Sequence, residues 1–252
     1  MGTLTEHVAL VTGASHGIGT AIARLFSAEG AAVAVHGRDG DAVAHLVAEL
    51  TAAGGRAVGV VGDLTQEGEA ARVVEEAEAA LGPLSILVAN AGGNPVPPGP
   101  VEEIGLDAWR SAVDANLTIT FLTIAAALPG MKQRGRGSIV TVASAASRRP
   151  TAYTPVPYAA AKAGIEALTR LVALQAGPQG VRANCVAPET ILTQRNARLI
   201  PPDMQDQMVA THPVRRLGTP DDVAQAALYL ASDAAEWVSG ITIDVAGGSV
   251  IA

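Results

Sequence analysis

Short runs of apolar residues alternate along the chain with longer segments that are rich in alanine and leucine. Most of the short runs lack interleaved polar positions, which is typical of strands buried on both faces of a parallel sheet. We predict strands at Val8–Val11, Ala32–Val35, Ala57–Val61, Ile86–Ala89, Ser138–Val142, Arg182–Ala187 and Ile241–Val245.

We predict helices between these strands at Thr20–Glu29, Asp41–Ala53, Glu67–Leu81, Leu106–Met131, Tyr158–Gln175 and Pro220–Ala231. This alternation indicates an α/β fold, a doubly wound parallel sheet of about seven strands with helices on both faces. No linker divides residues 1–252, so we expect a single domain. Gly92–Pro100 and Thr190–Thr211 are predicted loops over a site at the carboxyl ends of the strands, the second with a short helix near Pro201–Met208.

Three glycines separate the first predicted strand from the first predicted helix, in the sequence Thr12-Gly-Ala-Ser-His-Gly-Ile-Gly19. Glycine allows a sharp turn and a close approach of the backbone to a pyrophosphate, whose charge is favoured at a helix N-terminus. The alternative is an ordinary turn between a strand and a helix without a ligand.

Tyr158 and Lys162 are four positions apart in a predicted helix, so both lie on one face of it. Free tyrosine has a pKa of about 10, and a cationic lysine nearby favours the phenolate and lowers that pKa. Tyr158 then suits general acid–base chemistry on a carbonyl or an alcohol. Ser144 ends the fifth predicted strand and Asn116 lies inside a predicted helix, where it could simply bend the helix.

These features, in this order, resemble the short-chain dehydrogenase/reductase family over essentially the whole chain, with similarity to 3-oxoacyl-[acyl-carrier-protein] reductases. The resemblance implies a Rossmann-type domain that interconverts a ketone and a secondary alcohol by hydride transfer. It implies that Tyr158 is the general acid/base and that Ser144 orients the substrate oxygen. It also implies that Lys162 holds the nicotinamide ribose and that Asn116 holds a water of a proton relay. Ser147 is a rival to Ser144, but it lies farther from the strand end.

The resemblance also implies a set of cofactor-binding residues. Ala89 and Glu189 depart from the family pattern, in which asparagine and glycine are usual. Glu189 either strains a backbone that glycine would relax, or points into the site and favours a cationic or hydroxyl-bearing substrate. Besides Tyr158 and Lys162, the implied contacts are Gly13, Ser15, His16, Gly17, Ile18, Gly19, Asp63, Leu64, Asn90, Ala91, Gly92, Pro188, Ile191, Thr193 and Glu189 itself.

The end of the second predicted strand favours NADP(H) over NAD(H), although NAD(H) remains possible. The position at which the family carries an acidic residue for NAD is Gly37, and Arg38 follows it. A guanidinium suits the 2′-phosphate of NADP through its charge and its forked hydrogen bonds. Asp39 is the competing ribose ligand, and we expect it to lie beyond the strand and face solvent.

Composition bears on the partners, the cellular location and the oligomeric state of the protein. The chain is 49% hydrophobic and 16% charged with a net charge of −7, which argues against nucleic acid as a partner. Cys185 is the only cysteine, and we expect no metal, no signal peptide and no membrane span, hence a cytoplasmic protein. The helix over Tyr158–Gln175 is apolar on several faces, and the family commonly forms tetramers, so we expect a homotetramer. A catalytically silent nucleotide sensor or scaffold, and a sugar-nucleotide epimerase, are the alternatives.

Overall fold

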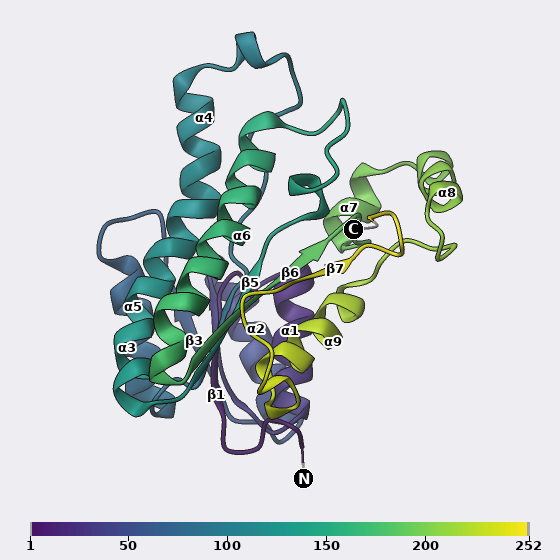
Figure 1. Ribbon diagram of the computed structural model, residues 1–252. Helices are drawn as coiled ribbons and strands as arrows, with labels where there is room; N and C mark the ends of the chain where they lie inside the picture. The colour runs from purple at the N-terminus through teal and green to yellow at the C-terminus, as the bar shows by residue number, and fades with distance from the viewer. Residues whose placement is uncertain (1, 251–252) are drawn as a thin grey trace.

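The computed structural model describes residues 2–250 and contains a parallel sheet of seven strands in the order β3-β2-β1-β4-β5-β6-β7 (Figure 1). All seven predicted strands are present, with ends that differ by a residue or two. The strands are β1 (Val8–Val11), β2 (Ala32–Gly37), β3 (Ala57–Val61), β4 (Ile86–Ala89), β5 (Gly137–Val142), β6 (Val181–Pro188) and β7 (Thr242–Val245).

Helices cover both faces of this sheet, as expected for strands that are apolar on both sides. Side chains of α1, α2 and α9 form one core with the sheet, and side chains of α3, α5 and α6 form the other. The helices are α1 (Gly17–Ala28), α2 (Gly40–Ala52), α3 (Glu69–Leu81), α4 (Leu106–Val113), α5 (Ile119–Arg134), α6 (Val156–Ala176), α7 (Gln194–Leu199), α8 (Pro202–Thr211) and α9 (Pro220–Ala231).

Two helical details differ from the sequence-based expectation. The helix predicted over Leu106–Met131 contains a π-helical turn, Asp114–Thr118, between α4 and α5. The segment predicted as a loop with one short helix contains two, because Thr193 accepts a hydrogen bond from the Asn196 N–H and starts α7 before α8 begins.

Within residues 2–250, one helical run, Leu106–Arg134, is long and apolar enough to cross a membrane by length and composition alone. The sequence analysis expects no such span. In the fold, α4 of this run packs against α6, and α5 packs against α3 and the sheet. Four apolar side chains of the run are buried in the protein core, those of Ile119, Ile124, Ala127 and Met131.

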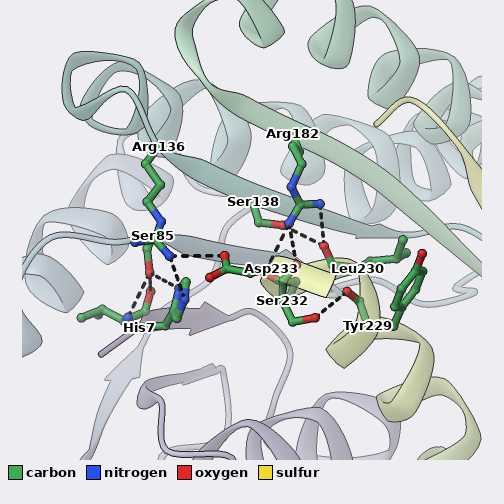
Figure 2. A network of polar contacts seen from close by, with 11 residues as sticks. His7, Ser85, Arg136, Ser138, Arg182, Tyr229, Leu230, Ser232 and Asp233 are labelled. Atoms are coloured by element: carbon green, nitrogen blue, oxygen red, sulfur yellow. Dashed lines mark hydrogen bonds and ion pairs between the residues drawn. The ribbon is translucent and has the colours of Figure 1, made fainter. Parts of the chain in front are cut away.

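The amino ends of the central strands are held by a polar network (Figure 2). Arg136 lies 3.2 Å from the His7 ring and 3.3 Å from the Asp233 carboxylate, and His7 also contacts the Ser85 hydroxyl. Arg182 donates hydrogen bonds to carbonyls at the end of α9. These contacts lie at the amino ends of the strands, which face away from the site.

The order of the strands places the candidate site at the carboxyl ends of the strands. From β1 the chain adds strands toward one side of the sheet, and from β4 it adds them toward the other side; β1 and β4 are neighbours. In such sheets the crevice outside the carboxyl ends of these two strands is where ligands bind.

Candidate active site

The glycine-containing loop is joined to the end of β4 by two side chains, those of Thr12 and Asn90. The Thr12 hydroxyl accepts hydrogen bonds from the N–H groups of Asn90 and Ala91, at 3.1 and 3.0 Å. The Asn90 amide in turn donates to the carbonyls of Thr12 and Gly13, at 2.9 and 3.1 Å. Residues far apart in sequence, Thr12–Gly13 and Asn90–Ala91, are thereby joined as one wall of the crevice.

The glycines of this loop are required by space and backbone conformation. Gly13 and Gly17 have φ values of 64° and 61°, which side-chain-bearing residues rarely adopt. A Cβ atom at Gly19 would lie 2.3 Å from the Gly13 carbonyl oxygen. The loop can therefore pack this closely only because these positions lack side chains.

The first turn of α1 suits an anion. His16 precedes α1 but makes no capping hydrogen bond to it, and no acidic residue lies in the first turn. The His16 ring contacts the Ser15 hydroxyl instead, at 3.1 Å. The early N–H groups of a helix lack partners within the helix, so those of Gly17, Ile18 and Gly19 face the crevice as donors. These residues fit the pyrophosphate of a dinucleotide.

Gly37, Arg38 and Asp39 occupy the end of β2 beside this loop. A Cβ atom at Gly37 would lie 2.9 Å from the Ser15 hydroxyl, so an acidic side chain there requires the loop to shift. Arg38 is exposed. The Asp39 carboxylate accepts a hydrogen bond from the Ala42 N–H at 3.0 Å and caps α2, on the exposed side of the strand end as expected.

Asp63 and Leu64 follow β3. The Asp63 carboxylate accepts hydrogen bonds from the Thr65 N–H and hydroxyl, which lower its pKa, with Arg38 adding a favourable charge. It therefore shapes a turn and does not cap α3, whose N-cap is Gly68. Leu64 is buried in the core, so only its backbone is available to a cofactor.

Asn116 lies in the π-helical turn and is fully buried. Its amide nitrogen donates to the Gly93 carbonyl at 2.7 Å and to the Ala112 carbonyl at 2.9 Å, while its amide oxygen accepts from the Gly93 N–H. One amide hydrogen thus holds the loop after β4, and the other binds the Ala112 carbonyl in α4. Only its oxygens are left to accept a hydrogen bond from the water expected from the sequence.

Lys162 is buried beside this loop. A Cβ atom at Gly92 would lie 2.8 Å from the Asn116 amide oxygen and 3.4 Å from the Lys162 Nζ. The Nζ donates to the Val142 carbonyl at 2.8 Å and lies 5.7 Å from the centre of the Tyr158 ring. Burial lowers the pKa of Lys162 to about 8. Asn116, Tyr158 and Lys162 are therefore brought together as predicted.

The pKa of Tyr158 differs from the expectation. Burial raises this pKa, and a hydrogen bond with Ser144 only partly opposes the rise. From the sequence, Lys162 is expected to lower this pKa toward neutrality, whereas in this structure burial of the phenol sets the direction of the shift. Tyr158 is consequently held as a neutral phenol that can donate a proton.

Ser144 lies at the end of β5, between Tyr158 and β6. Its hydroxyl contacts the Pro188 carbonyl at 3.4 Å and accepts a hydrogen bond from the Ala146 N–H at 3.2 Å. The rival Ser147 hydroxyl contacts the Ser144 carbonyl and the buried Glu166 carboxylate, each at 2.5 Å. Geometry therefore favours Ser144 over Ser147 as the hydroxyl that faces a substrate.

Glu189 follows β6, and the strained-backbone explanation weighed from the sequence does not describe it. Glu6 is the only non-glycine residue with positive φ within residues 2–250, so glutamate at 189 causes no strain of that kind. Its carboxylate lies 2.6 Å from the His212 Nε2 and also accepts from the Thr190 N–H. Both Glu189 and His212 line a cavity of about 280 Å³. His212 could not be recognised from the sequence, because nothing in the local pattern links it to Glu189.

The remaining predicted contacts also follow β6. Ile191 is buried in the core, and Thr193 places its methyl group 3.2 Å from where a Cβ atom of Gly17 would lie. A second missed residue is His36, which is buried next to Gly37 and accepts a hydrogen bond from the Gly13 N–H. A histidine inside an apolar strand is the signal that could have revealed it. In the part of the chain that is described, no three His, Cys, Asp or Glu side chains are grouped as metal ligands.

Comparison with known proteins identifies the family. A family model described as Enoyl-(Acyl carrier protein) reductase matches residues 13–249. The 7alpha-hydroxysteroid dehydrogenase of Escherichia coli (strain K12) is 38% identical over 242 residues, which cover 96% of this chain and 93% of the relative. The cis-4-hydroxycyclohexanecarboxylate dehydrogenase of Sinomonas cyclohexanicum is 41% identical over 243 residues, which cover 96% of each chain.

Solved structures agree with this. A 7 alpha-hydroxysteroid dehydrogenase complexed with NADH and 7-oxo glycochenodeoxycholic acid has a TM-score of 0.93 at 37% identity, covering 98% of this chain and 95% of that one. A gluconate 5-dehydrogenase from Burkholderia cenocepacia in complex with NADP and tartrate has a TM-score of 0.90 at 31% identity, covering 98% and 96%. The chain belongs to the short-chain dehydrogenase/reductase family and is an oxidoreductase, as its sequence indicates.

Proposed function

We propose that the protein is an NADP(H)-dependent oxidoreductase that interconverts a ketone and a secondary alcohol, with Tyr158 as general acid/base. The observation that carries this proposal is the convergence of three side chains at the carboxyl edge of the sheet. The Lys162 Nζ lies 5.7 Å from the Tyr158 ring centre, and the Ser144 side chain is close enough to the Tyr158 phenol to lower its pKa.

Bound NADP(H) supplies or accepts the hydride. In the reductive direction the Ser144 hydroxyl orients the carbonyl oxygen and the Tyr158 phenol donates its proton to that oxygen. The phenolate that remains is stabilised by the Lys162 ammonium. Because the pKa of Lys162 is about 8, most molecules carry this positive charge at neutral pH. The test is Tyr158→Phe, which should lose turnover while still binding NADPH.

The preference for NADP(H) is supported by the end of β2. Arg38 is exposed beside the loop that fits the pyrophosphate, and the competing Asp39 carboxylate is engaged in capping α2. Titration of nicotinamide fluorescence should show tighter binding of NADPH than of NADH. Replacing Arg38 with Ala should weaken NADPH binding by roughly tenfold and leave NADH binding nearly unchanged, since only NADPH presents a phosphate there. Stronger binding of NADH by the wild type would refute the preference.

Secondary alcohols on saturated rings are the substrate class that we propose. Two relatives described above are named for oxidation of a hydroxyl group on a steroid or cyclohexane ring. A panel of cyclic and open-chain ketones with NADPH tests the class, and faster turnover of open-chain ketones would contradict it. Binding of cofactor with no turnover of any ketone would favour the nucleotide-sensing alternative.

We further propose that the protein forms a homotetramer and is located in the cytoplasm. The exposed face of α6 carries Leu171 and Leu174, which are 56% and 75% exposed, and Trp237 is 99% exposed. Large apolar side chains in such positions are typical of interfaces between subunits. Sedimentation at micromolar concentration should give four chains per particle, and cell fractionation should recover the protein with the cytoplasm.

A further inference from the structure

The segment between β6 and α9 makes a long excursion that carries α7 and α8 beyond the end of the sheet (Figure 1). It starts beside the candidate site. The Pro188 carbonyl contacts the Ser144 hydroxyl, and Thr193 lies against Gly17 of the glycine-containing loop. The position of this excursion therefore bears on the binding of both cofactor and substrate.

The Glu189 carboxylate contacts both ends of the excursion. At the outgoing end it accepts hydrogen bonds from the Thr190 N–H at 2.5 Å and from the Thr190 hydroxyl at 3.2 Å. At the returning end it lies 2.6 Å from the His212 Nε2. The other His212 nitrogen lies 2.7 Å from the Met208 carbonyl, in the last turn of α8. One carboxylate and one imidazole thus join the end of β6, the base of the excursion and α8.

The imidazolium form of His212 satisfies both contacts. Two acceptors, a carboxylate oxygen and a carbonyl oxygen, face its two nitrogens, and only the protonated ring donates from both. Burial alone would lower the pKa of His212, but the hydrogen bonds with Met208 and Glu189 outweigh it and raise the pKa above the usual value. The contact is therefore complete at low pH, and it is weakened as the pH rises through this raised pKa.

Other charged groups around His212 have partners of their own, although the buried Oδ1 of Asp244 has no hydrogen-bond partner among the described residues. Arg216 and Asp222 line the same cavity and bind each other at 2.6 Å, and Asp244, also in its wall, pairs with Arg148 at 3.3 Å. Arg149 disfavours the imidazolium, but more weakly than Glu189 favours it. Glu189 is thus the carboxylate that holds the charge of His212.

We propose that Glu189 and His212 are positioning residues that hold the α7–α8 excursion against the active site. The inference rests on the proposed reductase function only for its kinetic readout. The pair accounts for glutamate at the position where the family usually has glycine, since the side chain serves the excursion and does not contact the reacting atoms.

The experiment compares the wild type with His212→Gln, Glu189→Gln and the double variant, with His45→Gln as the matched control. His45 is an exposed histidine on α2, far along the chain from this pair. Glutamine at position 212 carries no charge and cannot hydrogen-bond with both the Glu189 carboxylate and the Met208 carbonyl as the imidazolium does. KM for a ketone and kcat are measured with NADPH from about pH 6 to about pH 9, which spans the range where a perturbed histidine titrates.

We expect His212→Gln to raise KM by roughly fivefold near pH 6 while kcat changes less than twofold. Near pH 9 the wild type and the variant should converge, because His212 is then uncharged and can donate to only one of its two acceptors. Lys162 titrates in the same range in every variant, so the difference between variants isolates His212. Glu189→Gln should give the same raised KM near pH 6 as His212→Gln. The KM of the double variant should be no higher than that of either single variant. An unchanged KM in His212→Gln, or additive effects in the double variant, would overturn the proposal.

Limited trypsin digestion provides a readout that does not need activity. Arg195 and Arg198 are exposed on α7 within the excursion. At pH 7, cleavage there should be several-fold faster in His212→Gln than in the wild type or in His45→Gln. Equal cleavage rates would also overturn the proposal. An enzyme inactive with every ketone but with this cleavage pattern would refute the proposed function and leave the positioning role intact.

Discussion

Replacing the buried Lys162 with methionine should stabilise the fold while abolishing turnover. Lys162 is 4% exposed, and its Nζ has one hydrogen bond among the described residues, to the Val142 carbonyl. Methionine has a similar length and no charge, so it fills the same space without the cost of burying an ammonium group.

The magnitude follows from the shifted titration. The pKa of Lys162 falls from 10.5 to about 8, which corresponds to about 3 kcal/mol, since each tenfold change in a dissociation constant is about 1.4 kcal/mol. Loss of the hydrogen bond to the Val142 carbonyl offsets about 1–2 kcal/mol of this. The net gain is about 1–2 kcal/mol at pH 7, or about 3–6 °C in Tm for a domain of this size.

The sign of the pH dependence gives a sharper test. The folded protein releases the Lys162 proton near pH 8, whereas the unfolded chain holds it until about pH 10.4. Wild-type stability therefore rises with pH across this interval relative to Lys162→Met. Thermal unfolding of both proteins without cofactor, at pH 7 and at about pH 9.5, should show the advantage of the variant shrinking. A variant less stable than wild type at pH 7, or an advantage independent of pH, would refute the reasoning.

Three further predictions concern separate parts of the molecule. Tyr158→Phe should lower kcat by roughly 10²–10⁴-fold while NADPH fluorescence titrations stay within about twofold, and retained turnover would exclude Tyr158 as the acid. Gly19→Ala should weaken NADPH binding by at least about tenfold, because the new Cβ would meet the Gly13 carbonyl at 2.3 Å. Gly99→Ala, where nothing lies within 4 Å of the Cβ, is its control. Thr219→Ala removes a capping box at the start of α9 and should cost about 1 kcal/mol in denaturant titrations without changing kcat.

The sheet and the grouping of the candidate catalytic side chains could be predicted because their signals are local. A strand buried on both faces is apolar throughout, and a loop that approaches a phosphate requires glycine, so both are visible in a short window of sequence. Tyr158 and Lys162 are joined by one helix, whose period fixes their shared face. Because the carboxyl ends of neighbouring parallel strands lie on the same side of the sheet, the position of Ser144 after a strand predicts that it lies near them.

The parts that were not predicted depend on distant contacts. Glu189 and His212 are 23 positions apart, and only the fold of the excursion makes them partners. Asn116, in the π-helical turn, hydrogen-bonds with the Gly93 backbone 23 positions away, a contact that residue spacing does not report. The raised pKa of Tyr158 depends on its burial, which residue spacing does not report.

The contacts of the candidate catalytic residues connect their geometry to the sheet. The Lys162 ammonium is held by a carbonyl at the end of β5, and the Ser144 hydroxyl by one at the end of β6. The Asn116 amide is held by the backbone that follows β4. A shift of one strand relative to its neighbours would therefore separate the side chains of the candidate active site. Because the polar network at the opposite edge fixes the same strands (Figure 2), substitution of Arg136 should lower activity through the register of the sheet although it lies at the far end of β5.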